Sequence, residues 1–178
     1  MSELDACAHN LPYPPVRVLC QNEQTVNLIR PLYAGAAGEL TAIAQYLYQE
    51  LCVDSRYPDL AALLERISIA EMRHLQLLGE LIVQLGGDPQ YYAKTPYRRR
   101  GNANQYWNAS FVNYEMDARA ILTENIRAEE AAIRAYQDAI CAITEEGIRA
   151  LLRRICMDEQ MHLNEFQCAL ADLSSCDS

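Results

Sequence analysis

The sequence predicts an all-helical protein built as a bundle of four helices. Glycine and proline are scarce, whereas alanine, leucine, isoleucine and glutamate are abundant. The period-two alternation typical of β-strands is missing, and apolar residues recur instead at steps of three and four. At 178 residues the chain is long enough for one well-buried core, and no shift in composition marks a boundary. We therefore expect a single domain over residues 1–178.

The N-terminal part predicts an extended arm followed by the first long helix. Prolines at 12, 14 and 15 disfavour a helix over about residues 1–21. The first long helix is expected at about 31–53, with a shorter helical piece before it. Because proline suits the first turn of a helix and not its interior, Pro31 is expected to open this helix. A turn over Asp54–Pro58 then ends the first helix.

The second helix and the segment after it have contrasting patterns. Asp59 is expected to begin the second helix, which continues to the stop signal Gly86-Gly87-Asp88-Pro89. From about 88 to 115 the sequence is rich in tyrosine, asparagine and arginine and has no helical stripe. This segment is predicted to be a long irregular crossover.

The C-terminal half predicts a second helical hairpin. The third helix is expected over about 116–143 and the fourth over about 146–173, with Thr144–Gly147 as a short turn that has capping character. Two helical hairpins joined by one long connection are the connectivity of ferritin-like bundles.

Two predicted helices carry the same polar pair within an apolar stripe. On the second helix, Glu71 and His74 fall where the stripe of leucine and isoleucine side chains would otherwise continue. The fourth helix repeats this arrangement with Glu159 and His162. A single Glu-x-x-His match would be weak evidence, but here the pair lies on the core face of two independent helices.

The first and third helices carry a second matched pair of residues. Glu39 precedes Tyr46 by seven residues, and Glu129 precedes Tyr136 by the same interval, which places each pair on one helix face. Glu39 also precedes Glu71 by nearly the same number of residues as Glu129 precedes Glu159. We expect the two hairpins to be related by a pseudo-twofold axis. The tyrosines are either core residues or donors to the carboxylates.

The six inward-facing residues predict a site for two metal ions. Ionised carboxylates in an apolar core cost several kcal/mol each, but two divalent cations would balance four glutamates. Imidazole and carboxylate ligands suit iron, manganese or zinc, and the i, i+3 spacing lets Glu and His of one helix reach a common site. The predicted ligands are Glu39, Glu71, His74, Glu129, Glu159 and His162.

Composition argues against several other classes of function. The formal charge of −9 opposes binding to nucleic acid or to anionic membranes. No apolar run approaches the roughly 18 residues of a spanning helix, and the first ten residues do not resemble a signal peptide, so a cytoplasmic location is expected. Seven cysteines without a C-x-x-C pair are expected to be reduced thiols. Residues 98–100, all arginine, are either a solvated stretch or subunit contact, or an anion site.

The chain resembles the manganese catalases and their spore-coat relatives within the ferritin-like superfamily. The resemblance runs from about Leu11 to Leu173. It is carried by LPYPPVRV, GELTAIAQYL, AEMRHLQLLGELI, WNASFV and DEQMHLNEF. It implies a di-manganese protein that converts hydrogen peroxide into water and dioxygen, commonly as a homo-oligomer, with the spore coat as an alternative location.

The resemblance also implies roles for individual ligands. Glu71 would bridge the two metals, with Glu39 and His74 on one ion and Glu129 and His162 on the other. In the family, the glutamate that matches Glu159 pairs with an arginine beside the third-helix ligand and stands just outside the metal shell. Here that neighbour is Ala128, so we expect Glu159 to coordinate directly and to act in catalysis.

Two other functions fit the same scaffold. The first is a rubrerythrin-like di-iron peroxidase or ferroxidase, although rubrerythrins usually carry a further iron module held by four cysteines, and C-x-x-C pairs are absent here. The second is a metal-binding coat or assembly protein with little turnover, because fold and ligands do not prove catalysis. Manganese and iron share these ligands, so the residues do not distinguish the two metals.

Overall fold

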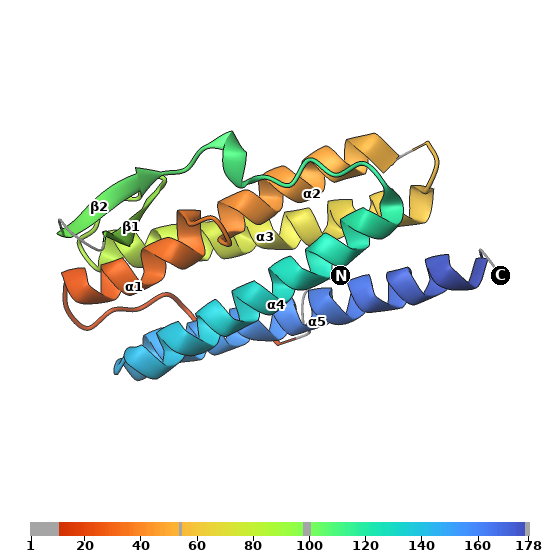
Figure 1. The fold of residues 1–178 in the computed structure, drawn as a ribbon. Coiled ribbons are helices and arrows are strands. Elements are labelled where there is room, and N and C mark those ends of the chain that lie inside the picture. The colour runs from red at the N-terminus through yellow and green to blue at the C-terminus, as the bar shows by residue number, and fades with distance from the viewer. Residues whose placement is uncertain (1–10, 54, 98–100, 177–178) are drawn as a thin grey trace.

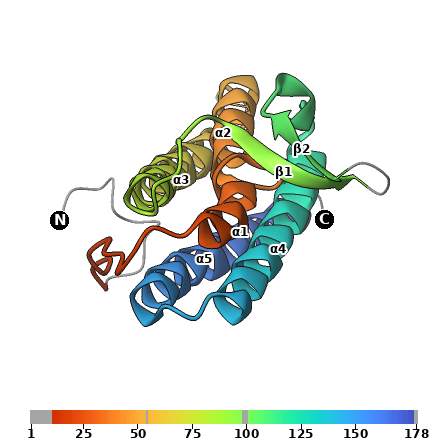
Figure 2. The same ribbon diagram turned by 90° about the vertical axis from the view of Figure 1, so that its left-hand side faces the viewer.

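Four long helices form the bundle in the computed structural model, which describes residues 11–53, 55–97 and 101–176 (Figure 1). Helices α2 (Glu39–Val53) and α3 (Pro58–Gln84) form one hairpin, and α4 (Ala118–Ala142) and α5 (Glu146–Cys176) form the other. Viewed from one end, the two hairpins lie side by side around a common interior (Figure 2). The predicted ferritin-like four-helix bundle, with its long crossover between the hairpins, is confirmed.

The first predicted helix is wrong at its start. A separate helix, α1 (Glu23–Ala34), precedes α2, and Pro31 lies inside its last turns instead of opening the next helix. Proline removes one backbone donor, but Pro31 is exposed and the helix continues only to Ala34, so the loss is confined to the end of the element. The amide of Gly35 donates to the carbonyl of Pro31 and ends α1.

A tight turn at residues 35–38 separates α1 from α2 and brings backbone atoms into close contact. A Cβ at Gly38 would lie 2.5 Å from the carbonyl oxygen of Leu32 and 2.6 Å from that of Pro31. Only glycine allows this approach, so the chain can turn there and start α2 at Glu39. The turn thus places a predicted ligand in the first turn of a helix.

The crossover is more regular than the sequence predicts. Strands β1 (Tyr92–Tyr97) and β2 (Gly101–Tyr106) pair antiparallel, with Tyr92 opposite Tyr106, and a short 3₁₀ helix (Ala109–Phe111) follows. The prediction of an irregular segment was therefore wrong. Asparagine, glycine and proline hide these strands in the sequence, because pairing depends on tertiary contacts as well as on propensity.

Side chains attach the crossover to the helices. The guanidinium of Arg30 on α1 lies 3.9 Å from the ring centre of Tyr92. The indole Nε1 of Trp107 donates to Thr41 Oγ1 at 3.0 Å, and the amide of Asn113 donates to Gln45 Oε1 at 2.9 Å. The crossover is thereby held along α2, next to the start of that helix.

Two apolar clusters fill the bundle, one on each side of a buried polar layer. One cluster contains Leu78 and Leu81 of α3 with Ile155 of α5, and the other contains Leu64 of α3 with Phe166 of α5. The predicted ligands of α3, α4 and α5 lie between these clusters along their helices. The polar layer is therefore enclosed by apolar side chains from both ends.

Several expectations from the sequence concern the cysteines or residues that lie outside the described part of the chain. The five cysteines that can be assessed are free thiols, as expected, and Cys7 lies outside the described residues. Asp54, placed in a turn by the sequence, and the arginines at 98–100 also lie outside them. Among the helices of the described part, none is both long and apolar enough to cross a membrane.

Candidate metal centre

All six predicted ligands lie in the interior of the bundle. Glu39 of α2 is 4% exposed, and the other five are at most 1% exposed. Potential ligand atoms from these residues form two groups, and in each group the atoms lie within 4.8 Å of one another. The first group is Glu39, Glu71, His74 and Glu159, and the second is Glu71, Glu129, Glu159 and His162.

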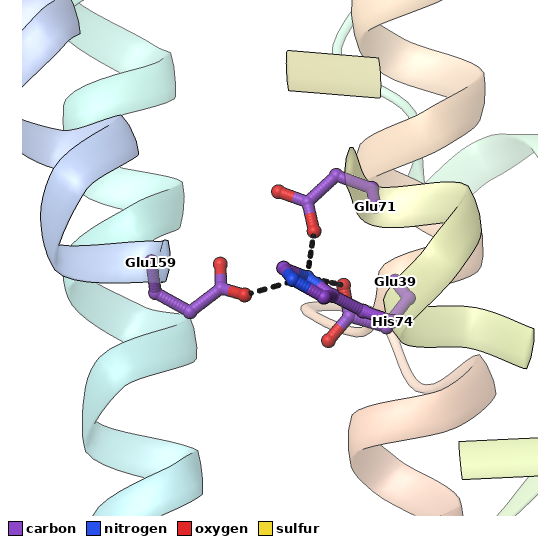
Figure 3. Close-up of side chains that lie close together, drawn as sticks. All are labelled: Glu39, Glu71, His74 and Glu159. Carbon is purple, nitrogen blue, oxygen red and sulfur yellow. Dashed lines mark hydrogen bonds and ion pairs between the residues drawn. The ribbon is translucent and has the colours of Figure 1, made fainter. Parts of the chain in front are cut away.

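Glu71 and Glu159 belong to both groups, and each directs its two oxygens to different imidazoles. Oε2 of Glu71 lies 2.7 Å from Nδ1 of His74, whereas Oε1 lies 3.0 Å from Nδ1 of His162. For Glu159, Oε1 lies 3.0 Å from Nδ1 of His74 and Oε2 lies 3.8 Å from Nδ1 of His162. Figure 3 shows Glu159 of α5 reaching across to His74 of α3. Two carboxylates are thus positioned to bridge two adjacent centres.

The surroundings of His74 are better suited to a cation than to hydrogen bonds alone. Its Nδ1 lies within 4 Å of one oxygen each from Glu71, Glu159 and Glu39. An imidazole nitrogen carries at most one proton and cannot serve three carboxylates. Oε1 of Glu71 and Oε1 of Glu159 each lie 3.0 Å from an imidazole nitrogen, but neither contact has the geometry of a hydrogen bond. Nitrogen and oxygen lone pairs that converge in this way are the donor set of a transition-metal site.

Burial and mutual repulsion govern the protonation of the carboxylates. Burial, followed by the charges of Glu159 and Glu71, raises the pKa of Glu39 well above its usual range, and the same causes raise the pKa of Glu129. Burial also opposes ionisation of Glu71, but the imidazoles of His162 and His74 outweigh it and lower the pKa of Glu71. Without cations the cluster therefore retains protons, whereas two divalent ions would balance the charge of four carboxylates.

Two tyrosines brace the outer carboxylates in a crossed arrangement. The hydroxyl of Tyr46 on α2 donates to Glu129 on α4 at 2.5 Å, and the hydroxyl of Tyr136 on α4 donates to Glu39 on α2. Both rings are buried, at 1% exposed. The sequence left open whether the tyrosines are core residues or donors to the carboxylates, and in the structure they are both. The crossed pairs match the predicted pseudo-twofold relation.

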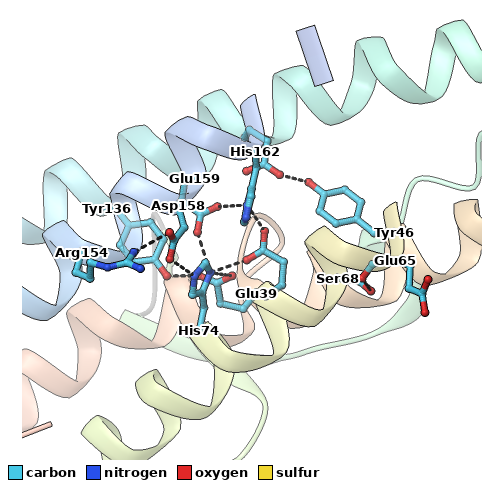
Figure 4. A network of polar contacts seen from close by, with 12 residues as sticks. Glu39, Tyr46, Glu65, Ser68, His74, Tyr136, Arg154, Asp158, Glu159 and His162 are labelled. Carbon is cyan, nitrogen blue, oxygen red and sulfur yellow. Dashed lines mark hydrogen bonds and ion pairs between the residues drawn. The ribbon is translucent and has the colours of Figure 1, made fainter. Parts of the chain in front are cut away.

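Sequence reasoning missed a polar network behind His74 (Figure 4). Asp158 is fully buried, and its Oδ2 lies 3.1 Å from Nε2 of His74, while Oδ1 pairs with Arg154 at 2.7 Å. The hydroxyl of Tyr13 donates to Asp158 Oδ2 at 2.6 Å. Such contacts fix the ring orientation and tautomer of a ligating histidine. The Arg154–Asp158 spacing of four residues was the available signal, but the sequence could not place Tyr13.

A cavity of about 260 Å³ adjoins the carboxylates. Glu39, Glu129 and Glu159 line its inner part, and exposed residues such as Ala36 and Arg127 line its outer part. Much of the remaining wall consists of alanine and glycine, including Ala128. The cavity therefore connects the carboxylates with the surface and is suited to small molecules.

The fold and the buried cluster define a class of protein: ferritin-like bundles with carboxylate and histidine side chains at their centre. The sequence model of the family described as Rubrerythrin matches residues 32–170, and the chain belongs to this family.

Several known proteins are similar to the chain. The bacterioferritin of Desulfovibrio desulfuricans is 32% identical over 151 residues, which cover 83% of this chain and 76% of that protein. A probable manganese catalase of Clostridium acetobutylicum is 27% identical over 169 residues, 87% of this chain and 74% of that protein. CotJC of Bacillus subtilis is 28% identical over 166 residues, 86% of each chain.

Solved structures share the fold. KatB, a manganese catalase from Anabaena PCC7120, superposes with a TM-score of 0.76 at 24% identity, covering 93% of this chain and 80% of KatB. The Desulfovibrio desulfuricans bacterioferritin superposes with a TM-score of 0.69 at 27% identity, covering 86% and 81%. The expected kinship with manganese catalases and spore-coat relatives is confirmed, and the kinship extends to bacterioferritins.

Proposed function

We propose that this chain binds two manganese ions and converts hydrogen peroxide into water and dioxygen. The observation that carries the proposal is that Glu71 and Glu159 each offer one oxygen to each of the two imidazole Nδ1 atoms. Both carboxylates would bridge the ions. The terminal ligands would be Glu39 and His74 on one ion and Glu129 and His162 on the other.

The access route supports a small substrate. Five alanines and one glycine form part of the wall of the cavity beside the carboxylates, and Ala128 is one of them, next to Glu129. A longer side chain at 128 would extend toward the carboxylates and compete for this space. Ala128 leaves this space open, and Glu159 lies close to the Nδ1 atoms of both imidazoles, which supports direct coordination by Glu159.

The chain's own groups would manage the protons of the reaction. When bound, the metal pair supplies a two-electron couple, so that one peroxide is reduced to two waters and another is oxidised to dioxygen. The two protons released by the oxidised peroxide equal the two that the reduced peroxide consumes. Glu159 lines both the cavity and the cluster, so an oxygen of its carboxylate that is not bound to an ion would be placed to hold a proton between the two half-reactions.

The test is oxygen release by manganese-loaded protein without added reductant, measured with an oxygen electrode. We expect one dioxygen for two peroxides consumed. Glu71→Gln and His162→Ala should each abolish the release. Glu65→Gln changes an exposed glutamate of the same helix as Glu71 and is the matched control, which should retain activity. Protein that holds two manganese ions and leaves peroxide unchanged would contradict the proposal.

A di-iron peroxidase or ferroxidase is a second candidate, favoured by the family match and by the 32% identity with a bacterioferritin. Iron-loaded protein would then consume peroxide only with a reductant, or would oxidise added Fe²⁺. Both activities are measured optically on the same preparations. Their presence, together with no oxygen release from the manganese form, would replace the catalase proposal.

A coat or assembly role is a third candidate, because the chain is 28% identical to CotJC. We also expect a homo-oligomer, which light scattering on the purified protein would measure. Metal-loaded protein that is inactive in every assay and is recovered from spore coats would favour this role.

A further inference from the structure

The N-terminal arm reaches the candidate metal centre through one side chain. The hydroxyl of Tyr13 lies 3.2 Å from Nε2 of His74 and donates to Asp158 Oδ2 at 2.6 Å. Burial is the largest cause that raises the pKa of Tyr13, to about 12, so the phenol keeps its proton at neutral pH. Tyr13 therefore contacts the side of the imidazole opposite to the Nδ1 atom that faces the carboxylates.

The arm is held in this place by a closed set of contacts. Arg154 donates through Nε to the carbonyl oxygen of Leu11 at 2.6 Å, and its guanidinium lies 4.3 Å from the ring centre of Tyr13. The same guanidinium pairs with Asp158 Oδ1 at 2.7 Å. Backbone, ring and hydroxyl of the arm thus all contact the Arg154–Asp158 pair, which in turn contacts His74.

The chemistry of these contacts sets the tautomer of His74. Asp158 is an acceptor at Nε2, so the imidazole proton belongs on Nε2 and the lone pair on Nδ1 is available to a cation. The Tyr13 hydroxyl donates to Oδ2, the same oxygen that faces Nε2 of His74. This hydrogen bond hinders rotation of the carboxylate away from the ring. Tyr13 thus restrains the orientation of Asp158 and, through it, of His74.

We propose that Tyr13 is a positioning residue for His74, and that docking of arm residues 11–15 controls the affinity of the metal position formed by Glu39 and His74. The inference rests on the metal centre of the proposed function. Each chain has one Tyr13 hydroxyl, and it contacts His74, so its effect belongs to one of the two positions. The position formed by Glu129 and His162 should depend on it much less.

The test is stepwise metal titration of Tyr13→Phe, with bound Mn²⁺ or Co²⁺ measured by calorimetry and elemental analysis. One binding step should weaken by about 10- to 100-fold, the range typical of groups that orient a ligand, while the other stays near the wild-type value. Tyr33→Phe is the matched control, because it removes the hydroxyl of a buried tyrosine that donates to the carbonyl of Pro89, away from the ligands. It should change neither binding step.

Double variants assign the weakened step. Glu39→Gln already weakens the metal position that Tyr13 supports, so adding Tyr13→Phe should lower the metal affinity little further. In the double variant Glu129→Gln with Tyr13→Phe, the two losses of affinity should affect different ions and add. Equal weakening of both steps in Tyr13→Phe, or wild-type binding, would overturn the inference. These outcomes leave the catalase proposal intact, and inactive protein with two bound ions would overturn that proposal while leaving this one intact.

Coupling of arm and metal has a second readout. If docking of the arm raises metal affinity, the metal must favour the docked arm to the same extent. Arg17 is exposed and follows the docked residues, so trypsin cleavage after it reports on the arm. Metal should slow this cleavage in the wild type and have a smaller effect in Tyr13→Phe. Cleavage that does not respond to metal in the wild type would overturn the coupling.

Discussion

Glu71 is the side chain on which the candidate centre depends most, because its two oxygens face different imidazoles. It is fully buried, and the charges of both imidazoles lower its pKa despite the burial. Glu159 also lies near both imidazoles and is buried as well, but its side chain lines the cavity. The two shared carboxylates therefore have different environments, one enclosed by protein and one beside the cavity.

Glu71→Gln is expected to weaken metal binding at both positions. The amide carries no charge, and its nitrogen has no lone pair to offer to a cation. The affinity for metal ions should fall further than it does when a group that only orients a ligand is lost, which typically costs about 10- to 100-fold. Elemental analysis after dialysis measures the stoichiometry. The exposed Glu65→Gln should still hold two ions, and two ions in Glu71→Gln would contradict the bridging role.

The raised pKa of Tyr33 predicts that the folded protein loses stability at alkaline pH. Burial, followed by the neighbouring Tyr91, raises the pKa of Tyr33 from 10.0 to about 12 in the folded protein. Its stabilisation is thus complete below pH 10 and is lost as the pH rises toward 12. Urea unfolding of the wild type and of Tyr33→Phe should converge over this window. Tyr57→Phe, altered at an exposed phenol, is the control, and a constant difference between wild type and Tyr33→Phe would refute the effect.

Among the elements, the ends of helices were easier to predict than the packing of the arm and the crossover. The stop at Gly86 was recognisable, and Gly86, the second residue after the end of α3, has a φ of +83°. The break before α2 was missed, because the sequence alone does not show that the glycine at 38 permits a close backbone approach. Tyr13 was missed for a related reason: its partners lie far along the chain, and no periodicity links an extended arm to a helix.

The centre itself was predictable to the extent that it follows helical periodicity. Glu71 and His74 interrupt an apolar stripe, which is visible in the sequence and fixes the face they occupy. The position of Glu159 near both imidazoles was not visible, because it depends on how closely α3 and α5 approach. The polar residue Asp158, adjacent to a ligand, has no place in a stripe and emerged only from the structure.

Gly86→Ala is expected to destabilise the end of α3. An alanine at positive φ costs about 1–2 kcal/mol, and its Cβ would lie 2.9 Å from the side chain of Gln21. For a chain of this size, each kcal/mol lowers the melting temperature by about 2–4 °C. Gly147→Ala is the matched control, because its Cβ would meet only an ordinary contact at 3.5 Å. Calorimetry showing equal melting temperatures for both variants would contradict the role of Gly86.

At the level of the whole molecule, metal removal is expected to lower stability. Apo protein keeps four buried carboxylates close together, and a cation that binds only the folded state adds about 2.7 kcal/mol at a concentration 100 times its dissociation constant. The melting temperature should fall by about 2–4 °C for each kcal/mol lost. Differential scanning calorimetry of chelated and reloaded samples measures the change. Equal melting temperatures would count against a buried metal site.

The division of the interior into two apolar clusters has a consequence for how the molecule unfolds. Because the polar layer separates the clusters, side-chain packing at one end of the bundle does not directly support packing at the other. The helices continue through the polar layer. Within this layer, the strongest links between the two hairpins would be the bridging carboxylates and their ions. The cooperativity of unfolding is then expected to depend on the bound ions: with two ions the protein should unfold as one unit, whereas without them either end should be able to open while the other stays folded.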